Sequence, residues 1–174
     1  MNALRQALIV IDIQNDYFDG GKFPLWNADQ TLFNIEKAVQ SAQAKHIPVI
    51  LVQHISSAPK GSAAFFEADS HGADIHSVLK ALVPDAPVVV KRFADSFHQT
   101  TLQSILDGEG IQELLICGMM TQNCVTHTAI SKNADAYSVK VLADCSTTVT
   151  EMIHKIALSA LTTRVSVVTA DQVF

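Results

Sequence analysis

The sequence has little of several features that would point to other classes of protein. It has no excess of positive charge, since 12 Lys and Arg stand against 17 Asp and Glu, for a net charge of −5. Binding to the phosphate backbone requires clustered basic residues, so we expect no nucleic-acid partner. No apolar run approaches the ~20 residues of a membrane span, and the short run before Asp12 fits no signal peptide.

Cysteine is scarce and odd in number, with Cys117, Cys124 and Cys145. An odd count does not suit a disulfide framework, and free thiols persist in reducing compartments, so we expect a cytoplasmic protein. Cys117 lies inside an apolar strand pattern, where a buried and inert thiol is usual. Cys145 has no helix-start signature and is also expected to be structural.

Short apolar runs alternate with helical patterns along the chain. Apolar runs cover residues 8–12, 48–52, 88–90, 114–117, 139–143 and 165–168, and helical spacing covers 31–44, 100–106, 123–134 and 150–161. Near-continuous Val, Ile and Leu are typical of parallel strands covered on both faces. We predict a single domain over residues 1–174, a three-layer α/β/α sandwich with a six-stranded, mainly parallel, doubly wound sheet. Residues 56–72 are expected to form a long loop that shapes the pocket.

Three of the apolar runs lead into a side chain that can do chemistry. Residues 9–16 (IVIDIQND) contain Asp12, residues 87–91 (PVVVK) end in Lys91, and residues 116–125 (ICGMMTQNCV) contain Cys124. Ligands of open parallel sheets bind beyond the carboxyl ends of the strands. An acid or base, a cation and a nucleophile are therefore expected to converge at one edge of the sheet.

Cys124 begins the helix predicted for residues 123–134. Unpaired backbone N–H groups and the helix dipole favour an anion there, so the position is expected to lower the pKa of the thiol. The alternative is a small apolar residue that packs the helix start. Asp12 and Lys91 would each be costly to bury alone. As a pair they form either a structural ion pair or a catalytic one, with the carboxylate as general base for the thiol.

The motifs together resemble the isochorismatase-like cysteine hydrolase superfamily, in order and over nearly the whole chain. They are residues 12–18 (DIQNDYF), 90–91 (VK) with 96–102 (SFHQTTL), and 118–125 (GMMTQNCV). The last motif is most similar to the broad amidase branch that includes streptothricin hydrolase-like members. The resemblance implies hydrolysis of a small-molecule amide through a thioester acyl-enzyme.

Roles for individual residues follow from this resemblance. It implies Asp12 as general base, Lys91 as the cation that holds the base, and Cys124 as nucleophile. It also implies a cis peptide between Met119 and Met120, which turns the Met120 amide toward the site. The backbone amides of Met120 and Cys124 would then form an oxyanion hole.

The sequence also departs from particular branches of the superfamily. Nicotinamidases usually carry an Asp-x-His pattern and a further histidine that bind a metal, whereas residues 53–57 read QHISS. We therefore expect no metal and no other cofactor; a metal-dependent nicotinamidase-type amidase using His54 and His71 is the alternative. Vinyl-ether hydrolysis of the isochorismatase type and a non-catalytic ligand-binding protein also stay open. Residues 69–76 (DSHGADIH) match no common metal spacing and are expected to be a solvated loop that leads into a helix cap.

Candidates for the substrate wall are apolar or soft residues near the strand ends: Phe18, Trp26, His54, Phe93, Phe97 and Met120. Phe18 and Phe97 are more often core residues, while Trp26 and His54 could serve either purpose. His127, one turn after Cys124, is an alternative base, but the resemblance favours Asp12. The resemblance, together with apolar positions in the helix at 150–161, implies a homo-oligomer, a dimer or tetramer.

Overall fold

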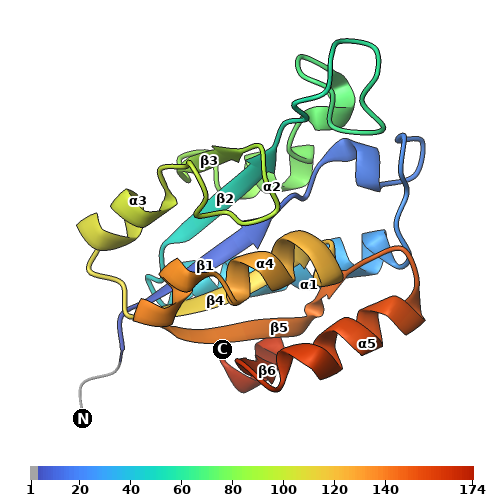
Figure 1. Cartoon of the computed structure of the whole chain (residues 1–174). Coiled ribbons are helices and arrows are strands. Elements are labelled where there is room, and N and C mark those ends of the chain that lie inside the picture. Colours follow the sequence, from blue (N-terminus) through green and yellow to red (C-terminus); the bar gives the residue numbers. More distant parts are fainter. Residues whose placement is uncertain (1–3) are drawn as a thin grey trace.

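A computed structural model describes residues 4–174, which form a six-stranded sheet with helices on both faces (Figure 1). The strands are β1 (Gln6–Ile11), β2 (Val49–His54), β3 (Val88–Lys91), β4 (Glu113–Met119), β5 (Ser138–Thr147) and β6 (Ser166–Val168). Their order across the sheet is β3-β2-β1-β4-β5-β6, and every neighbouring pair is parallel. The predicted three-layer, doubly wound fold is confirmed.

The helices divide the core into two layers because successive residues of a strand point to opposite faces. They are α1 (Ala28–Ala44), α2 (Ser77–Leu82), α3 (Leu102–Gly108), α4 (Thr126–Ala129) and α5 (Glu151–Leu161). Leu8 and Val10 of β1 pack with α1 and α2 on one face. Ala7, Ile9 and Ile11 pack with α3 and α4 on the other. The strands at the centre of the sheet are therefore buried on both sides.

Two sequence-based expectations about individual elements are wrong. β3 is an edge strand, and its Val88 and Val90 side chains are 45% and 49% exposed instead of buried. The helix predicted for residues 123–134 is broken into a π-helix (Thr121–Val125), the single turn of α4 and a 3-10 helix (Lys132–Ala136). The helix start expected after residues 69–76 is that of α2, which lies in the long connection between β2 and β3.

β1 and β4 meet at the centre of the sheet, where the order of strands reverses. This is the place at which doubly wound sheets bind ligands. Asp12 follows β1 directly and takes a left-handed backbone conformation with φ of 54°. Gly118, near the end of β4, has φ of 125°, and a Cβ atom there would lie 2.1 Å from the carbonyl oxygen of Ile11. The glycine therefore allows the two strand ends to approach each other closely.

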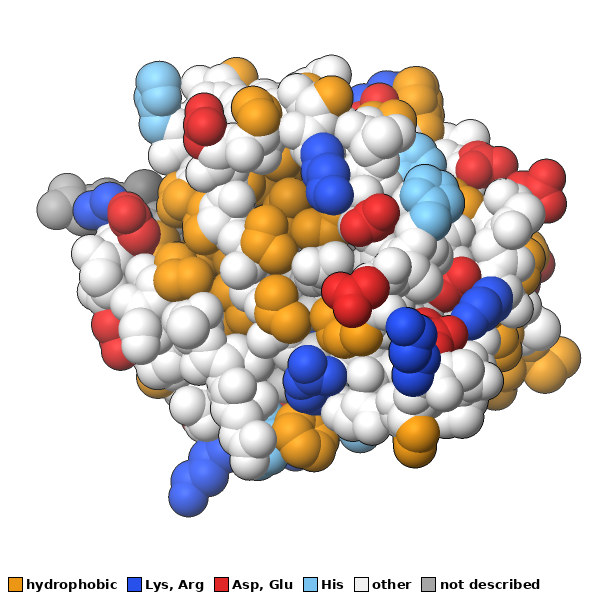
Figure 2. All heavy atoms as spheres, turned by 90° about the horizontal axis from the view of Figure 1, so that it is seen from above, with side chains coloured by type: hydrophobic (Ala, Val, Ile, Leu, Met, Phe, Trp, Pro, Cys, Tyr) orange, Lys and Arg blue, Asp and Glu red, His pale blue; other side chains and the backbone are white. Residues whose placement is uncertain are grey.

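Among residues 4–174, no helix has both the length and the apolar character needed to cross a bilayer. Figure 2 views the molecule from above, the side on which β3 lies in Figure 1, and shows hydrophobic side chains interspersed with charges of both signs.

Candidate active site

The site is built around the ammonium group of Lys91. Its Nζ lies 2.8 Å from Oδ2 of Asp12 and 3.1 Å from Sγ of Cys124. The three residues are 1%, 0% and 2% exposed, and both oxygens of the Asp12 carboxylate are sealed from solvent. Three strand ends that are far apart in the sequence thus bring a carboxylate, an ammonium and a thiol into direct contact.

Two neutral acceptors complete the surroundings of the ammonium. Nδ1 of His54, at the end of β2, lies 2.9 Å from Lys91 Nζ, and the carbonyl oxygen of Phe93 lies 3.2 Å from it. An ammonium has three N–H donors. The group of four acceptors therefore shares three hydrogens, and the buried positive charge is well solvated by protein atoms.

The electrostatics of Cys124 differ from what its sequence position suggested. Burial raises the pKa of the thiol, the Asp12 carboxylate raises it further, and Lys91 only partly opposes them. The expectation of a lowered pKa is wrong because Cys124 is the fourth residue of a π-helix and lies against a carboxylate, not at the open start of a long helix. Burial tends to lower the pKa of Lys91, but Asp12 and Cys124 raise it overall. These directions favour an ammonium and a protonated thiol as the resting pair.

The turn that carries Cys124 is held by contacts from both sides. The peptide bond between Met119 and Met120 is cis. The hydroxyl of Thr126 donates to the carbonyl oxygen of Thr121 at 2.6 Å, and the Thr121 hydroxyl lies 2.8 Å from Nδ1 of the buried His154 on α5. These contacts fix the backbone just before the thiol.

Gln14, two residues after Asp12, fastens β2 to the site. Its side-chain amide donates to the carbonyl oxygens of His54 and Ala73, at 2.8 and 2.7 Å, and its Oε1 accepts from the His54 amide at 2.8 Å. The Gln14 side chain is fully buried. Two of its three hydrogen bonds therefore hold the His54 backbone, and the third holds Ala73.

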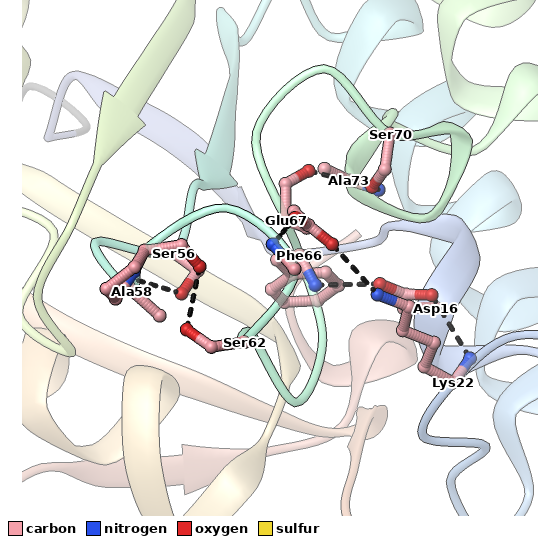
Figure 3. Close-up of polar contacts among 11 residues, drawn as sticks. Asp16, Lys22, Ser56, Ala58, Ser62, Phe66, Glu67, Ser70 and Ala73 are labelled. Atoms are coloured by element: carbon pink, nitrogen blue, oxygen red, sulfur yellow. Dashed lines mark hydrogen bonds and ion pairs between the residues drawn. The ribbon is translucent and has the colours of Figure 1, made fainter.

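The long connection after β2 folds back onto the segment that follows β1 (Figure 3). The Asp16 carboxylate accepts from the Phe66 amide at 2.7 Å and from the Lys22 amide at 3.1 Å. Glu67 forms an ion pair with Lys22 and also accepts from the Gly61 amide. A Cβ atom at Gly72 would lie 2.1 Å from Asp16 Oδ1. One buried carboxylate therefore holds residues 56–72, the loop whose course the sequence left open, at Phe66 and at Gly72.

The chain is similar in sequence and in structure to known proteins. The isochorismatase domain matches residues 6–172. The chain belongs to the isochorismatase family of hydrolases. The isochorismatase family protein YddQ of Bacillus subtilis is 38% identical over 151 residues, which are 86% of this chain and 82% of YddQ.

Two further proteins are similar to this isochorismatase-family chain, one in sequence and one in structure. The ureidoacrylate amidohydrolase RutB of Methylobacterium radiotolerans is 28% identical over 187 residues, covering 90% of this chain and 72% of RutB. The crystal structure of an isochorismatase-like hydrolase from Alkaliphilus metalliredigens superposes with a TM-score of 0.87 at 26% identity, covering 97% of this chain and 96% of that one.

The residues predicted to line the substrate site fall into different surroundings. His54 contacts Lys91 directly, and Phe93 reaches Lys91 through its backbone while its ring packs on His98. Met120 precedes the π-helix and is 7% exposed. Phe18 and Phe97 are buried, one in each layer of the core. The Trp26 ring is 37% exposed and lies 5.9 Å from the His154 ring.

The histidines weighed as alternatives lie elsewhere. His127 is exposed on α4. His71 is exposed in the 3-10 helix (His71–Ala73), 3.7 Å from Asp74, and His76 caps the start of α2 by accepting from the Val78 amide. Residues 69–76 are therefore a loop that ends in a helix cap, as predicted.

Two aromatic residues near the site were not singled out from the sequence. Burial raises the pKa of Tyr17, and the nearby charges of Asp12 and Cys124 raise it further. The Phe66 ring lies 4.4 Å from the Tyr17 ring and 6.0 Å from the His54 ring, measured between centroids. Tyr17 could have been found from its motif, residues 12–18, whereas Phe66 lies in a loop without a pattern.

Asp12, His54 and Cys124 have ligand atoms within 4.8 Å of one another, a spacing that suits a metal ion. The Lys91 ammonium, however, lies 2.8 to 3.1 Å from each of these atoms. A metal cation there would face a second positive charge at contact distance beside the buried Asp12 and Cys124 side chains. The side chains of this family member therefore fit an ammonium at that point and do not fit a metal.

Proposed function

We propose that this chain hydrolyses a small-molecule amide through a covalent thioester on Cys124. The observation that carries the proposal is the position of Lys91 Nζ, which contacts both the Asp12 carboxylate and the Cys124 sulfur. A nucleophile in contact with a base-and-cation pair is the arrangement that covalent hydrolysis requires. The name of the relative RutB, an amidohydrolase, supports the same class of bond.

The reaction begins from the protonated thiol. Sγ of Cys124 attacks the amide carbonyl carbon while its proton passes to the Asp12 carboxylate. The C–N bond then breaks, and the amine leaves with the proton that Asp12 held. A water molecule attacks the thioester, gives one proton to Asp12, and the C–S bond breaks to release the carboxylic acid. The proton returns from Asp12 to sulfur, so one amide and one water become one acid and one amine.

Lys91 keeps the charges of this cycle balanced. It stabilises the Asp12 carboxylate before proton transfer and the sulfur anion as it forms. The backbone amides of Met120 and Cys124 are proposed to receive the negative oxygen of the tetrahedral intermediate, because donors fixed in a dry site stabilise developing charge strongly. Because burial raises the pKa of the thiol, attack by the sulfur requires a base that accepts its proton.

The test uses a panel of small amides with purified native protein, Cys124→Ala and Cys145→Ala. Both cysteines are buried, so the two variants are matched in chemistry and packing. We expect Cys124→Ala to lower kcat by about a thousandfold or more, as removal of a nucleophile does, and Cys145→Ala to stay close to native. Intact-mass spectrometry of the native enzyme under turnover should find an acyl adduct that is absent from Cys124→Ala.

The outcomes separate the alternatives. Full turnover by Cys124→Ala would exclude nucleophilic catalysis by this residue. Stoichiometric zinc, iron or manganese that activity requires would favour the nicotinamidase-type alternative. Cleavage of a vinyl ether but of no amide would favour the isochorismatase-type reaction.

A further inference from the structure

His54 contributes the one side chain in contact with the Lys91 ammonium that no catalytic step uses. It is half-buried, its backbone is clamped on both sides by Gln14, and its ring offers Nδ1 to Lys91 at 2.9 Å. Because an ammonium can only donate, Nδ1 must be the unprotonated nitrogen of a neutral ring. The proton of the ring is therefore on Nε2.

The four acceptors around Lys91 fall into two kinds. Asp12 and Cys124 change charge during the proposed reaction, because one gains a proton and the other forms a bond to carbon. Nδ1 of His54 and the carbonyl oxygen of Phe93 carry no formal charge and do not change. In the two tetrahedral intermediates the carboxylate holds a proton and the sulfur is bonded to carbon, so both bind the ammonium less strongly, while the second kind is unchanged.

We propose that His54 is a positioning residue that solvates the buried Lys91 ammonium through the whole catalytic cycle, and that it does so as the neutral Nε2–H tautomer. The proposal rests on the hydrolytic function proposed above, which supplies the steps that remove the other partners. Lys91 is 1% exposed, and an ammonium without acceptors in such a place is strongly destabilised. His54 thus keeps the charge of Lys91 available in the intermediate.

The surroundings of His54 agree with a neutral ring. The charged or titratable groups near it are Lys91 and Arg92, Asp12 after β1, and Cys124 of the π-helix. Burial lowers the pKa of His54, and Lys91 lowers it further against the opposite effect of Asp12. A protonated ring would place an N–H against the ammonium and break the contact.

The first experiment needs no substrate. The ring nitrogens of the histidines, labelled with ¹⁵N, are recorded by NMR for native protein and for Lys91→Met, with the His54 signals assigned by their loss in His54→Asn. We expect native His54 to be neutral with its proton on Nε2. In Lys91→Met the tautomer preference should weaken and the ring should protonate at higher pH. A native ring that is protonated, or protonated on Nδ1, overturns the proposal whether or not an amide is hydrolysed.

The second experiment measures kcat and KM for His54→Leu, His54→Asn and the exposed-histidine control His127→Leu. Leucine removes the acceptor, and we expect kcat to fall by roughly tenfold to a hundredfold, the factor expected when a buried donor loses its acceptor, with little change in KM. Asparagine places an amide oxygen near the position of Nδ1 and should restore most of kcat. His127→Leu should match native. A native kcat in His54→Leu, or no rescue by asparagine in a folded variant, would refute the positioning role.

The two proposals fail in different ways. Retention of turnover by Cys124→Ala would end the hydrolytic mechanism, while the NMR result would still decide the Lys91–His54 contact. If NMR shows a protonated His54 ring while Cys124→Ala has no turnover, only the role proposed for His54 is refuted.

Discussion

Gln14 and His54 exchange two hydrogen bonds of 2.8 Å, each between the side-chain amide of Gln14 and the backbone of His54. The two residues follow or end neighbouring parallel strands, so the pair locks the ends of β1 and β2 together. The same glutamine reaches Ala73 in the following loop. One buried side chain, Gln14, therefore fixes the ends of β1 and β2, the loop at Ala73, and His54, which contacts the Lys91 ammonium.

We predict that Gln14→Leu lowers both stability and activity. Each buried backbone group that loses its partner costs roughly 1–3 kcal/mol, and the free energy of unfolding measured in urea should fall accordingly. kcat should also fall because His54 loses its anchor. Gln53→Leu is the control: Gln53 is only half-buried and makes one comparable bond, to Ala73. An equal loss of activity in both variants would contradict the role of Gln14 in positioning His54.

Lys91→Met should destabilise the fold as well as abolish turnover. The substitution leaves the fully buried Asp12 carboxylate without its ion-pair partner, and breaking a buried pair on one side costs about 3–5 kcal/mol. The control is Lys155→Met, which breaks the exposed Lys155–Glu151 pair on α5 and should change stability by less than about 1 kcal/mol. Urea denaturation of the two variants measures the change in the free energy of unfolding. Similar changes in both variants would refute the claim that burial makes the loss of the Lys91–Asp12 pair costly.

Stability should fall as the pH rises above the ordinary thiol pKa of 9.0. Burial raises the pKa of Cys117, Cys124 and Cys145, so the folded chain keeps protons that the unfolded chain releases. The unfolded state then binds fewer protons, and the free energy of unfolding decreases with pH. Below the ordinary value this contribution is fully present.

The double variant Cys117→Ala/Cys145→Ala tests this dependence. It should lose stability at neutral pH because two buried side chains become smaller, yet its stability should fall less steeply above the ordinary thiol pKa. Urea unfolding at a series of pH values gives both slopes. Identical alkaline slopes in native and double-variant protein would show that the buried thiols do not set the decline.

Gly118→Ala should be strongly destabilising. The added Cβ would meet the Ile11 carbonyl oxygen, and φ of 125° is unfavourable for any other residue, so we expect a cost of at least about 2 kcal/mol. Gly108→Ala is the matched control because the space around Gly108, at the end of α3, is open. It should be neutral or stabilising by up to about 1 kcal/mol. Thermal melts compare the two, and equal Tm values would contradict the close approach of β1 and β4.

The convergence of Asp12, Lys91 and Cys124 was predictable because parallel strands end at one edge of a sheet. An apolar run followed by a reactive side chain places that side chain at this edge without knowledge of any distance. His54 could be named for the same reason, as the last residue of β2. The roles of these residues stay predictions until the variants are measured.

The sequence could not give the environment of each group. Cys124 was expected to have a lowered pKa from its place in the sequence, but burial beside Asp12 decides the direction. Val88 and Val90 have the composition of a buried strand, and only the order of strands makes them exposed. Both errors arise because burial depends on neighbours that are distant along the chain.

The contact between Asp16 and the Phe66 amide separates a fixed part of the long loop from an exchangeable part. Residues 57–64 lie between Ser56, whose amide donates to the Phe66 carbonyl oxygen, and Phe65, whose ring packs on Tyr17. They can change in length or composition while Asp16 holds the Phe66 end of the loop. Phe66 carries such a change to the neighbourhood of His54. A loop taken from a relative can therefore be grafted between Ser56 and Phe65 without altering Asp12, Lys91 or Cys124, and it would change only the surface segment that leads to the Phe66 ring.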